Sequence, residues 1–134
     1  ISGHSGSLTT VHASTPRDAA SRLETLCLMS DASLPVYVAR SQVASAIHLV
    51  VQLARFSDGS RRVKSISESL GLDDENRFMW RELYRFEANG LDENGRLQGD
   101  LVPTGDRPSF ESEPFEMGLA DRVRMTEAVF RKAR

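Results

Sequence analysis

An Asp58-Gly59 dipeptide stands between two strand-like segments of the sequence. Residues 48–56 (HLVVQLARF) form an almost continuous apolar run, which predicts a strand covered on both faces. Residues 61–69 (RRVKSISES) supply a partner strand. Asp-Gly between two such segments is a strong hairpin signal, because the tight turn requires positive φ angles that these residues tolerate. The chain is therefore expected to contain an antiparallel hairpin.

Two helices are expected before this hairpin. Thr15 is a candidate N-cap, Pro16 suits the first helical position, and Asp18 completes a capping-box pattern, so a helix is predicted over residues 16–29. A second helix is predicted from apolar residues at helical spacing, namely Val36, Ala39, Val43 and Ala46. In front of the first helix, the β-branched segment 7–13 (SLTTVHA) predicts a short strand.

Further strands and a terminal helix are expected after the hairpin. Residues 78–87 predict an aromatic strand, Asn89-Gly90 and Asn94-Gly95 predict turns, and residues 96–103 predict a return strand. Residues 105–114 predict a loop. Residues spaced four, three and four apart predict an amphipathic C-terminal helix: Leu119, Val123, Thr126 and Phe130. The order strand–helix–helix, then antiparallel hairpins and a C-terminal helix, indicates an α/β domain.

Composition limits the class of partner. The chain has 134 residues, which suits one domain, and a net charge of −2, which gives no electrostatic footprint for nucleic acid. Its one cysteine, Cys27, has no partner for an internal disulfide, and its apolar neighbours predict a buried free thiol in a reducing compartment. No apolar run approaches the ~20 residues of a membrane span. A cytoplasmic domain without nucleic-acid binding is expected.

The chemically active residue types gather near the start of the sequence. Residues 3–14 (GHSGSLTTVHAS) place His4 and His12 on either side of a run of small hydroxyl residues. Hydroxyls, glycine-flanked N–H groups and imidazole are small donors that suit oxyanions, and histidine changes charge near neutral pH. Open α/β sheets place ligands at strand ends. One hypothesis is therefore an oxyanion-facing edge.

Three other interpretations fit the same residues. The first is an ordinary strand with a hydrogen-bonded histidine at each end. The second is a metal site at His4 and His12, although seven intervening residues and no nearby cysteine make poor ligand spacing. The third is a hydrolytic triad of Ser7, His12 and Asp18, although no G-x-S-x-G elbow is present. Spacing alone leaves these alternatives open.

Other polar and aromatic residues are expected to serve the fold. His48 begins an apolar run and is expected at a strand end. Arg61 and Arg62 follow the hairpin turn and are expected to be solvated, with a subunit or phosphate contact as the alternative. Three aromatic residues at strand period two are expected in the core rather than on a base-stacking platform: Trp80, Tyr84 and Phe86.

Residues 2–26 (SGHSGSLTTVHASTPRDAASRLETL) resemble the histidine box and following helix of the tight-adherence (CpaF-type) pilus assembly ATPases, members of the type II/IV secretion ATPase superfamily. Residues 42–68 resemble the next helix, strand and hairpin of that family. The resemblance extends to residue 110, so residues 1–111 are expected to form the C-terminal half of a RecA-like domain. Residues 112–134 depart from the family and are expected to form a helical tail.

The resemblance implies an α/β ATPase that assembles as a cytoplasmic homo-hexamer at the inner face of the cytoplasmic membrane. Its implied partners are the inner-membrane platform proteins of a pilus or secretion system, and its implied ligands are ATP and Mg²⁺. By this resemblance, His4 and His12 lie near the γ-phosphate and couple nucleotide state to subunit movement. The nucleotide-binding residues that support them are Gly6, Ser7, Thr9 and Thr10.

The parts of such an ATPase that hold most of the nucleotide are missing from residues 1–134. The sequence has no G-x-x-x-x-G-K-[ST] phosphate loop and no acidic Walker B pair before the histidine box. Phosphoryl transfer depends on those parts. Because the sequence begins at Ile1 within the motif, a fragment of a longer ATPase, inactive by itself, is expected. The alternatives are a phosphate-loop-less paralogue that acts as an interaction module and an unrelated α/β binding domain.

Overall fold

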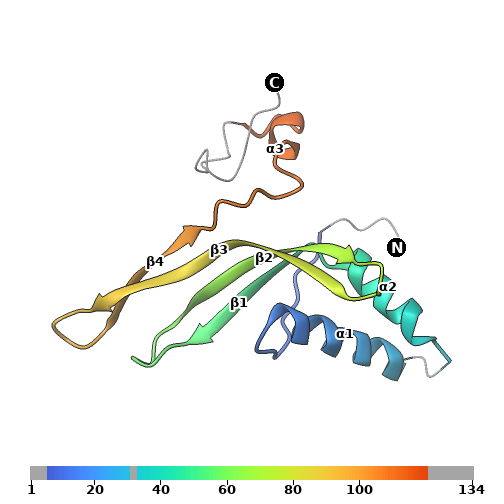
Figure 1. The fold of residues 1–134 in the computed structure, drawn as a ribbon, viewed down its shortest axis with the longest axis horizontal. Helices are drawn as coiled ribbons and strands as arrows, with labels where there is room; N and C mark the ends of the chain where they lie inside the picture. Colours follow the sequence, from blue (N-terminus) through green and yellow to red (C-terminus); the bar gives the residue numbers. More distant parts are fainter. Residues whose placement is uncertain (1–5, 31–32, 121–134) are drawn as a thin grey trace.

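Four antiparallel strands form a meander, and two helices pack against one end of it (Figure 1). The computed structural model describes residues 6–30 and 33–120. Its strands are β1 (Leu49–Arg55), β2 (Arg61–Leu72), β3 (Phe78–Leu91) and β4 (Leu97–Pro103), in the order β1-β2-β3-β4. Its helices are α1 (Pro16–Ser30), α2 (Val36–Ala46) and the single turn α3 (Glu113–Glu116). The chain is therefore mixed α/β, as the sequence predicts.

Helices α1 and α2 confirm the predicted pair, and polar contacts join them to the sheet. The backbone N–H of Asp18 donates to Thr15 Oγ1 at 3.1 Å, which is the expected N-cap contact. Arg40 of α2 donates to both carboxylate oxygens of Glu24 on α1, at 2.7 and 3.0 Å. Arg40 also donates to the carbonyl of Asn76 in the β2–β3 turn, at 3.1 Å. One guanidinium thus links both helices to the hairpin.

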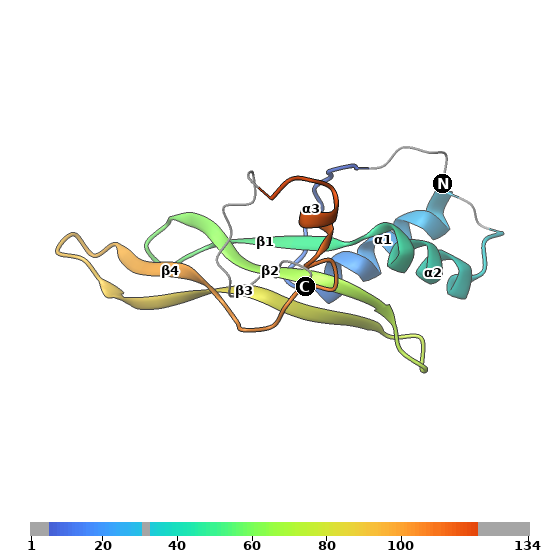
Figure 2. The ribbon, with the colours of Figure 1, turned by 90° about the horizontal axis from the view of Figure 1, so that it is seen from above.

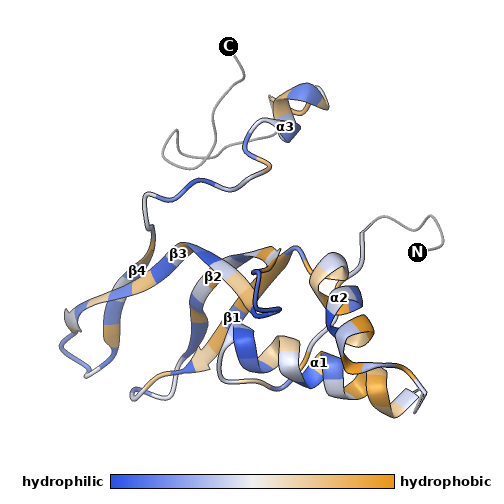
Figure 3. Cartoon of the chain, turned by 45° about the vertical axis from the view of Figure 1, so that its right-hand side comes forward, coloured by the Kyte–Doolittle hydropathy of each residue, from blue (hydrophilic) through white to orange (hydrophobic). Residues whose placement is uncertain are grey.

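The apolar core lies between these helices and the neighbouring end of β2 and β3. Its buried members are Ala20, Val43 and Phe78. Figure 3 shows apolar segments, in orange, on both helices and on the strands beside them. Half-buried side chains complete the cluster, among them Leu23, Cys27, Ala44, Ile47, Leu72 and Trp80. The Cys27 thiol packs against this core but is half-buried rather than fully buried as predicted.

Two of the three predicted turns are confirmed and one is wrong. The Asp58-Gly59 turn joins β1 to β2, and the Asn94-Gly95 turn joins β3 to β4. In the second turn, the Asp92 carboxylate accepts the N–H groups of residues 94 and 96, at 2.9 and 2.8 Å. Asn89-Gly90 lies inside β3, where the register shifts between Ala88 and Gly90. Because the Asp92 carboxylate stabilises the later turn, the earlier Asn-Gly is accommodated as a strand irregularity.

The strand predicted at residues 7–13 is absent. The prediction that both faces of β1 are covered is also wrong. Residues 6–13 form no regular secondary structure, because no strand in the described part of the chain pairs with them. Strand β1 alternates between half-buried and exposed residues. Leu49, Val51 and Leu53 are 45%, 53% and 65% exposed. The reason is that β1 is an edge strand and that the helices pack on one side of the sheet (Figure 2).

The C-terminal predictions are partly outside the described residues. The loop predicted over 105–114 ends earlier, because the single turn α3 begins at Glu113. The helix predicted from Leu119 to Phe130 lies almost wholly in residues 121–134, beyond the described part. Among the described helices, none combines the length and the apolar character needed to cross a bilayer.

A buried carboxylate joins the two hairpins at the end of the sheet away from the helices. The Asp58 side chain is 3% exposed and accepts hydrogen bonds from Ser60 N and Oγ, at 2.9 and 2.6 Å, and from Leu97 N, at 2.9 Å. Arg62 pairs with it at 3.4 Å and donates to the Leu97 carbonyl at 2.6 Å. The expectation that Arg62 is merely solvated is therefore wrong, because its guanidinium bridges β2 and β4.

We expect Asp58→Asn to lower stability near neutral pH and to have less effect as the pH falls from about 4 to about 2. Hydrogen bonds from the Ser60 hydroxyl, from the Ser60 and Leu97 N–H groups, and the charge of Arg62 lower the pKa of Asp58 to about 2. Because this value lies below the unfolded-state pKa of about 3.9, ionised Asp58 stabilises the fold above that pH. The contribution is lost as the pH falls through about 2.

Urea midpoints of both proteins, measured from about pH 6 down to about pH 2, check this expectation. Asp74→Asn is the matched control, because Asp74 is exposed and accepts no hydrogen bond from the described residues. A gap between wild type and Asp58→Asn that stays constant down to about pH 2 would contradict the role given to the carboxylate.

Candidate functional site

The predicted site residues that the structure describes lie on one extended, exposed segment. Gly6, Ser7, Thr9, Thr10 and His12 are all exposed. Within the described residues, none of the three hydroxyls and neither nitrogen of the imidazole has a hydrogen-bond partner. His4 lies outside the described residues. The segment therefore presents free donors on its surface, and it does so without belonging to a strand.

The segment is held at its C-terminal end, where it passes α1 and β1 (Figure 1). The guanidinium of Arg22, on α1, donates to the carbonyl of His12. The side-chain amide of Gln52, on β1, donates to the carbonyl of Ala13 at 3.0 Å. Two residues later, Thr15 caps α1. Both tethers use backbone carbonyls, so the His12 imidazole is left free.

The described residues bear differently on the metal, triad and oxyanion interpretations. Hydroxyl and imidazole donors without protein acceptors suit an oxyanion such as a phosphate. No group of three or more His, Cys, Asp and Glu residues in the described part of the chain is arranged to hold a metal ion. Asp18 is at the helix start, and no hydrogen bond connects it to His12 or Ser7 among the described contacts. The triad therefore has no support there.

A separate concavity lies beside the start of α1. It has a volume of about 460 Å³ and opens between that helix and the β2–β3 hairpin, with Arg17, Phe78 and Trp80 among its lining residues. Phe78 and Trp80 stack with ring centroids 6.3 Å apart, and the Trp80 Nε1 atom is buried without an acceptor in the described residues. His12 is not part of its lining.

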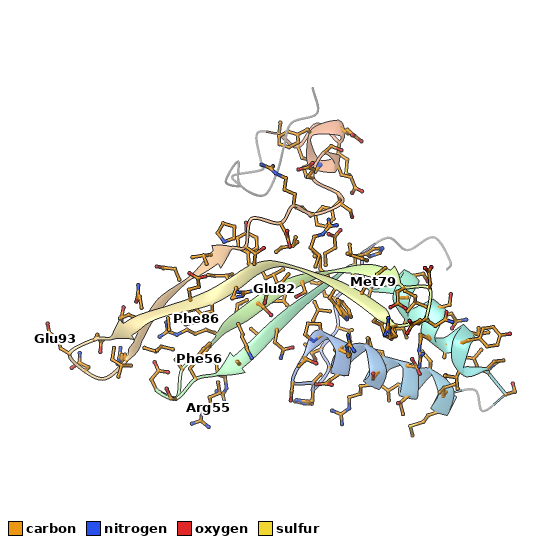
Figure 4. All side chains as sticks on the ribbon, in the orientation of Figure 1. Arg55, Phe56, Met79, Glu82, Phe86 and Glu93 are labelled. Carbon is orange, nitrogen blue, oxygen red and sulfur yellow. The ribbon has the colours of Figure 1, made fainter. Side chains whose placement is uncertain are left out.

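The aromatic stripe predicted for the core divides between two places. Trp80 packs against the helix-side core. Phe86 packs instead on Phe56 at the other end of the sheet, with ring centroids 4.9 Å apart (Figure 4). The Arg62 guanidinium carbon lies 5.5 Å from the Phe86 ring centroid. These rings stabilise the hairpins, and Phe86 is covered by Phe56 and Arg62 rather than presented as a stacking platform.

Sequence reasoning missed a buried charged cluster. Glu68 on β2 is 2% exposed, and both its oxygens accept the N–H of Ser109, at 3.0 and 3.1 Å. The Ser109 hydroxyl donates to the same carboxylate, and Arg81 pairs with it at 3.6 Å. Arg81 also donates to the Arg107 carbonyl at 2.7 Å. The cluster fastens residues 107–109 to the sheet; a lone Glu in an alternating strand carries no signal of this.

Comparison with known proteins adds no family assignment. The sequence matches no model of a protein family, and no curated protein matches it.

Proposed function

We propose that the protein is part of a hexameric ATPase that drives type IV (Flp/Tad) pilus assembly or type II/IV protein secretion. The observation that supports this most directly is the exposed segment 6–12, whose hydroxyl and imidazole donors have no acceptor in the described residues. Exposed hydroxyl and imidazole donors of this kind are available to an external oxyanion. The resemblance of residues 2–26 to a histidine box names that oxyanion as the γ-phosphate of ATP.

The residues of the segment fit the phosphate better than the metal. Ser7, Thr9 and Thr10 offer O–H donors, Gly6 leaves its backbone N–H accessible, and His12 donates from its imidazole. The segment contains no carboxylate, so Mg²⁺ and the rest of ATP are to be held by a phosphate loop and an acidic pair beyond these residues. When bound, Mg²⁺ neutralises charge between the β- and γ-phosphates. The chain by itself is expected not to hydrolyse ATP.

The proposed setting is a cytoplasmic homo-hexamer, peripheral to the inner membrane and in contact with its pilus or secretion platform proteins. Nucleic acid is not a proposed partner, because the net charge of −2 offers no attraction to it. The second candidate is a phosphate-loop-less paralogue that acts as a non-catalytic interaction module. The exposed apolar row of edge strand β1, formed by Leu49, Val51 and Leu53, favours that candidate.

We expect His12→Ala to lower kcat for ATP about a hundredfold in the gene product that joins these residues to a phosphate loop. The imidazole contributes a donor to charge that develops on the γ-phosphate, so its loss removes transition-state stabilisation. The KM for ATP is expected to change little, because other groups hold the nucleotide. Steady-state phosphate release by the purified hexamer measures both constants.

His48→Ala is the matched control, because His48 is also exposed but lies outside the segment, one residue before β1 begins. It is expected to leave kcat unchanged. Equal turnover by wild type and His12→Ala would overturn the catalytic proposal. A gene product without any phosphate loop, inert towards ATP, would favour the interaction module instead.

A further inference from the structure

Side chains from two separate elements hold two consecutive carbonyls of residues 6–13, the histidine segment. Arg22 of α1 donates to the carbonyl of His12, ten residues earlier, and Gln52 of β1 donates to the carbonyl of Ala13, 39 residues earlier. Gln52 also donates to the carbonyl of its neighbour Leu53 at 3.3 Å, which keeps its amide at the strand. These two hydrogen bonds, which we call the clamp, hold the backbone next to His12 between a helix and a strand.

The clamp compensates for the missing strand pairing. A segment in a sheet is oriented by its ladder of backbone hydrogen bonds, but residues 6–13 have no such ladder in the described part of the chain. Fixing the carbonyls of residues 12 and 13 fixes the peptide planes on the C-terminal side of His12. The guanidinium of Arg22 forms no ion pair with any described carboxylate, so the carbonyl of His12 is its described partner.

We propose that Arg22 and Gln52 are positioning residues that aim the His12 imidazole. This inference rests on the proposed function, because it assigns the two side chains to the same γ-phosphate site. Neither touches the nucleotide in this proposal; both act through the backbone of His12 and Ala13. A displacement of about 1 Å of a catalytic group can slow a reaction up to about a hundredfold. Loss of the clamp is therefore expected to slow the chemical step.

The first test measures the order of the segment in the 134-residue chain, without nucleotide. Arg22→Ala and Gln52→Glu each remove one donor, the second with almost no change of size. Backbone ¹⁵N order parameters of residues 9–13 are expected to fall from about 0.85 to below about 0.6, while those of α1 stay unchanged. The matched controls are Arg17→Ala on the same helix and Gln42→Glu on α2, whose side chains form no described hydrogen bond. Unchanged order in both clamp variants would overturn the inference.

The second test separates positioning from simple stability, in the gene product that joins these residues to a phosphate loop. Each clamp variant is expected to lower kcat for ATP about tenfold with little change in KM. Arg22→Lys retains a charged donor and is expected to restore most of the rate. A rise in KM without a fall in kcat, or a failure of Arg22→Lys to restore the rate, would overturn the positioning role.

The two proposals fail in different ways. Equal turnover of wild type and His12→Ala overturns the proposed function, whatever the order parameters show. Loss of turnover in His12→Ala, together with full turnover in both clamp variants, overturns the present inference and leaves the proposed function standing.

Discussion

Glu68→Ala is expected to destabilise the protein by about 3 kcal/mol. The substitution removes a carboxylate that is 2% exposed and leaves the N–H and hydroxyl of Ser109 without their acceptor. It also removes the opposite charge from Arg81, whose side chain is one-third exposed and so keeps part of its hydration. Breaking a buried charged pair from one side costs more than the pair contributes when intact. Equilibrium unfolding in urea measures the loss.

A second effect of Glu68→Ala separates this cluster from a general loss of packing. Residues 107–109 are fastened to β2 and β3 through Glu68 and Arg81, so their release exposes the bond after Phe110 to chymotrypsin. Glu68→Gln keeps one carbonyl acceptor and is expected to cost about half as much. Cleavage after Phe110 that is no faster in Glu68→Ala than in wild type would show that the cluster does not hold the loop.

Local signals with a physical cause predicted most of the secondary structure. Asp58-Gly59 and Asn94-Gly95 mark real turns because their geometry depends on residues within the turn. Thr15 and Pro16 mark the start of α1 because capping involves neighbours in sequence. Such signals depend mainly on neighbours in sequence, although Asn89-Gly90 shows that the same dipeptide can also be accommodated inside a strand.

Long-range features could not be predicted in the same way. The β-branched pattern of residues 7–13 describes side chains that suit a strand, but a strand also needs a partner, and the described chain provides none. The apolar run in β1 carries no information on which faces are covered, and one of them is exposed. Glu68 and Ser109 are 41 residues apart, and no local pattern joins them.

The candidate donors could be named from the sequence, whereas the contacts that hold their segment in place could not. Ser7, Thr9, Thr10 and His12 could be chosen from residue type alone, because hydroxyls and imidazole suit oxyanions wherever they are exposed. The clamp on His12 comes from a helix and a strand that approach it only in the folded chain. The way the segment is held therefore depends on packing that a motif does not encode.

Gly99→Ala is expected to destabilise the protein by about 3 kcal/mol, because no side chain fits between β3 and β4 at this point. A Cβ atom on Gly99 would lie 2.3 Å from the Glu87 carbonyl oxygen and 2.9 Å from the Ala88 Cα. Both are backbone atoms within a strand pair, so rotation of a flexible side chain does not relieve the clash. Gly99 pairs with Ala88, beside the register shift that ends at Gly90.

The matched control is Gly95→Ala in the β3–β4 turn. Gly95 has a φ of +74° and open space around its Cβ position, so alanine there is strained by the backbone alone and costs about 1 kcal/mol. Urea unfolding of the two variants compares steric and conformational costs within one hairpin. If Gly99→Ala lowers the free energy of unfolding no more than Gly95→Ala does, β3 and β4 do not approach each other closely at Ala88. The register shift at Asn89-Gly90 would then have to be replaced by a different pairing of β3 with β4.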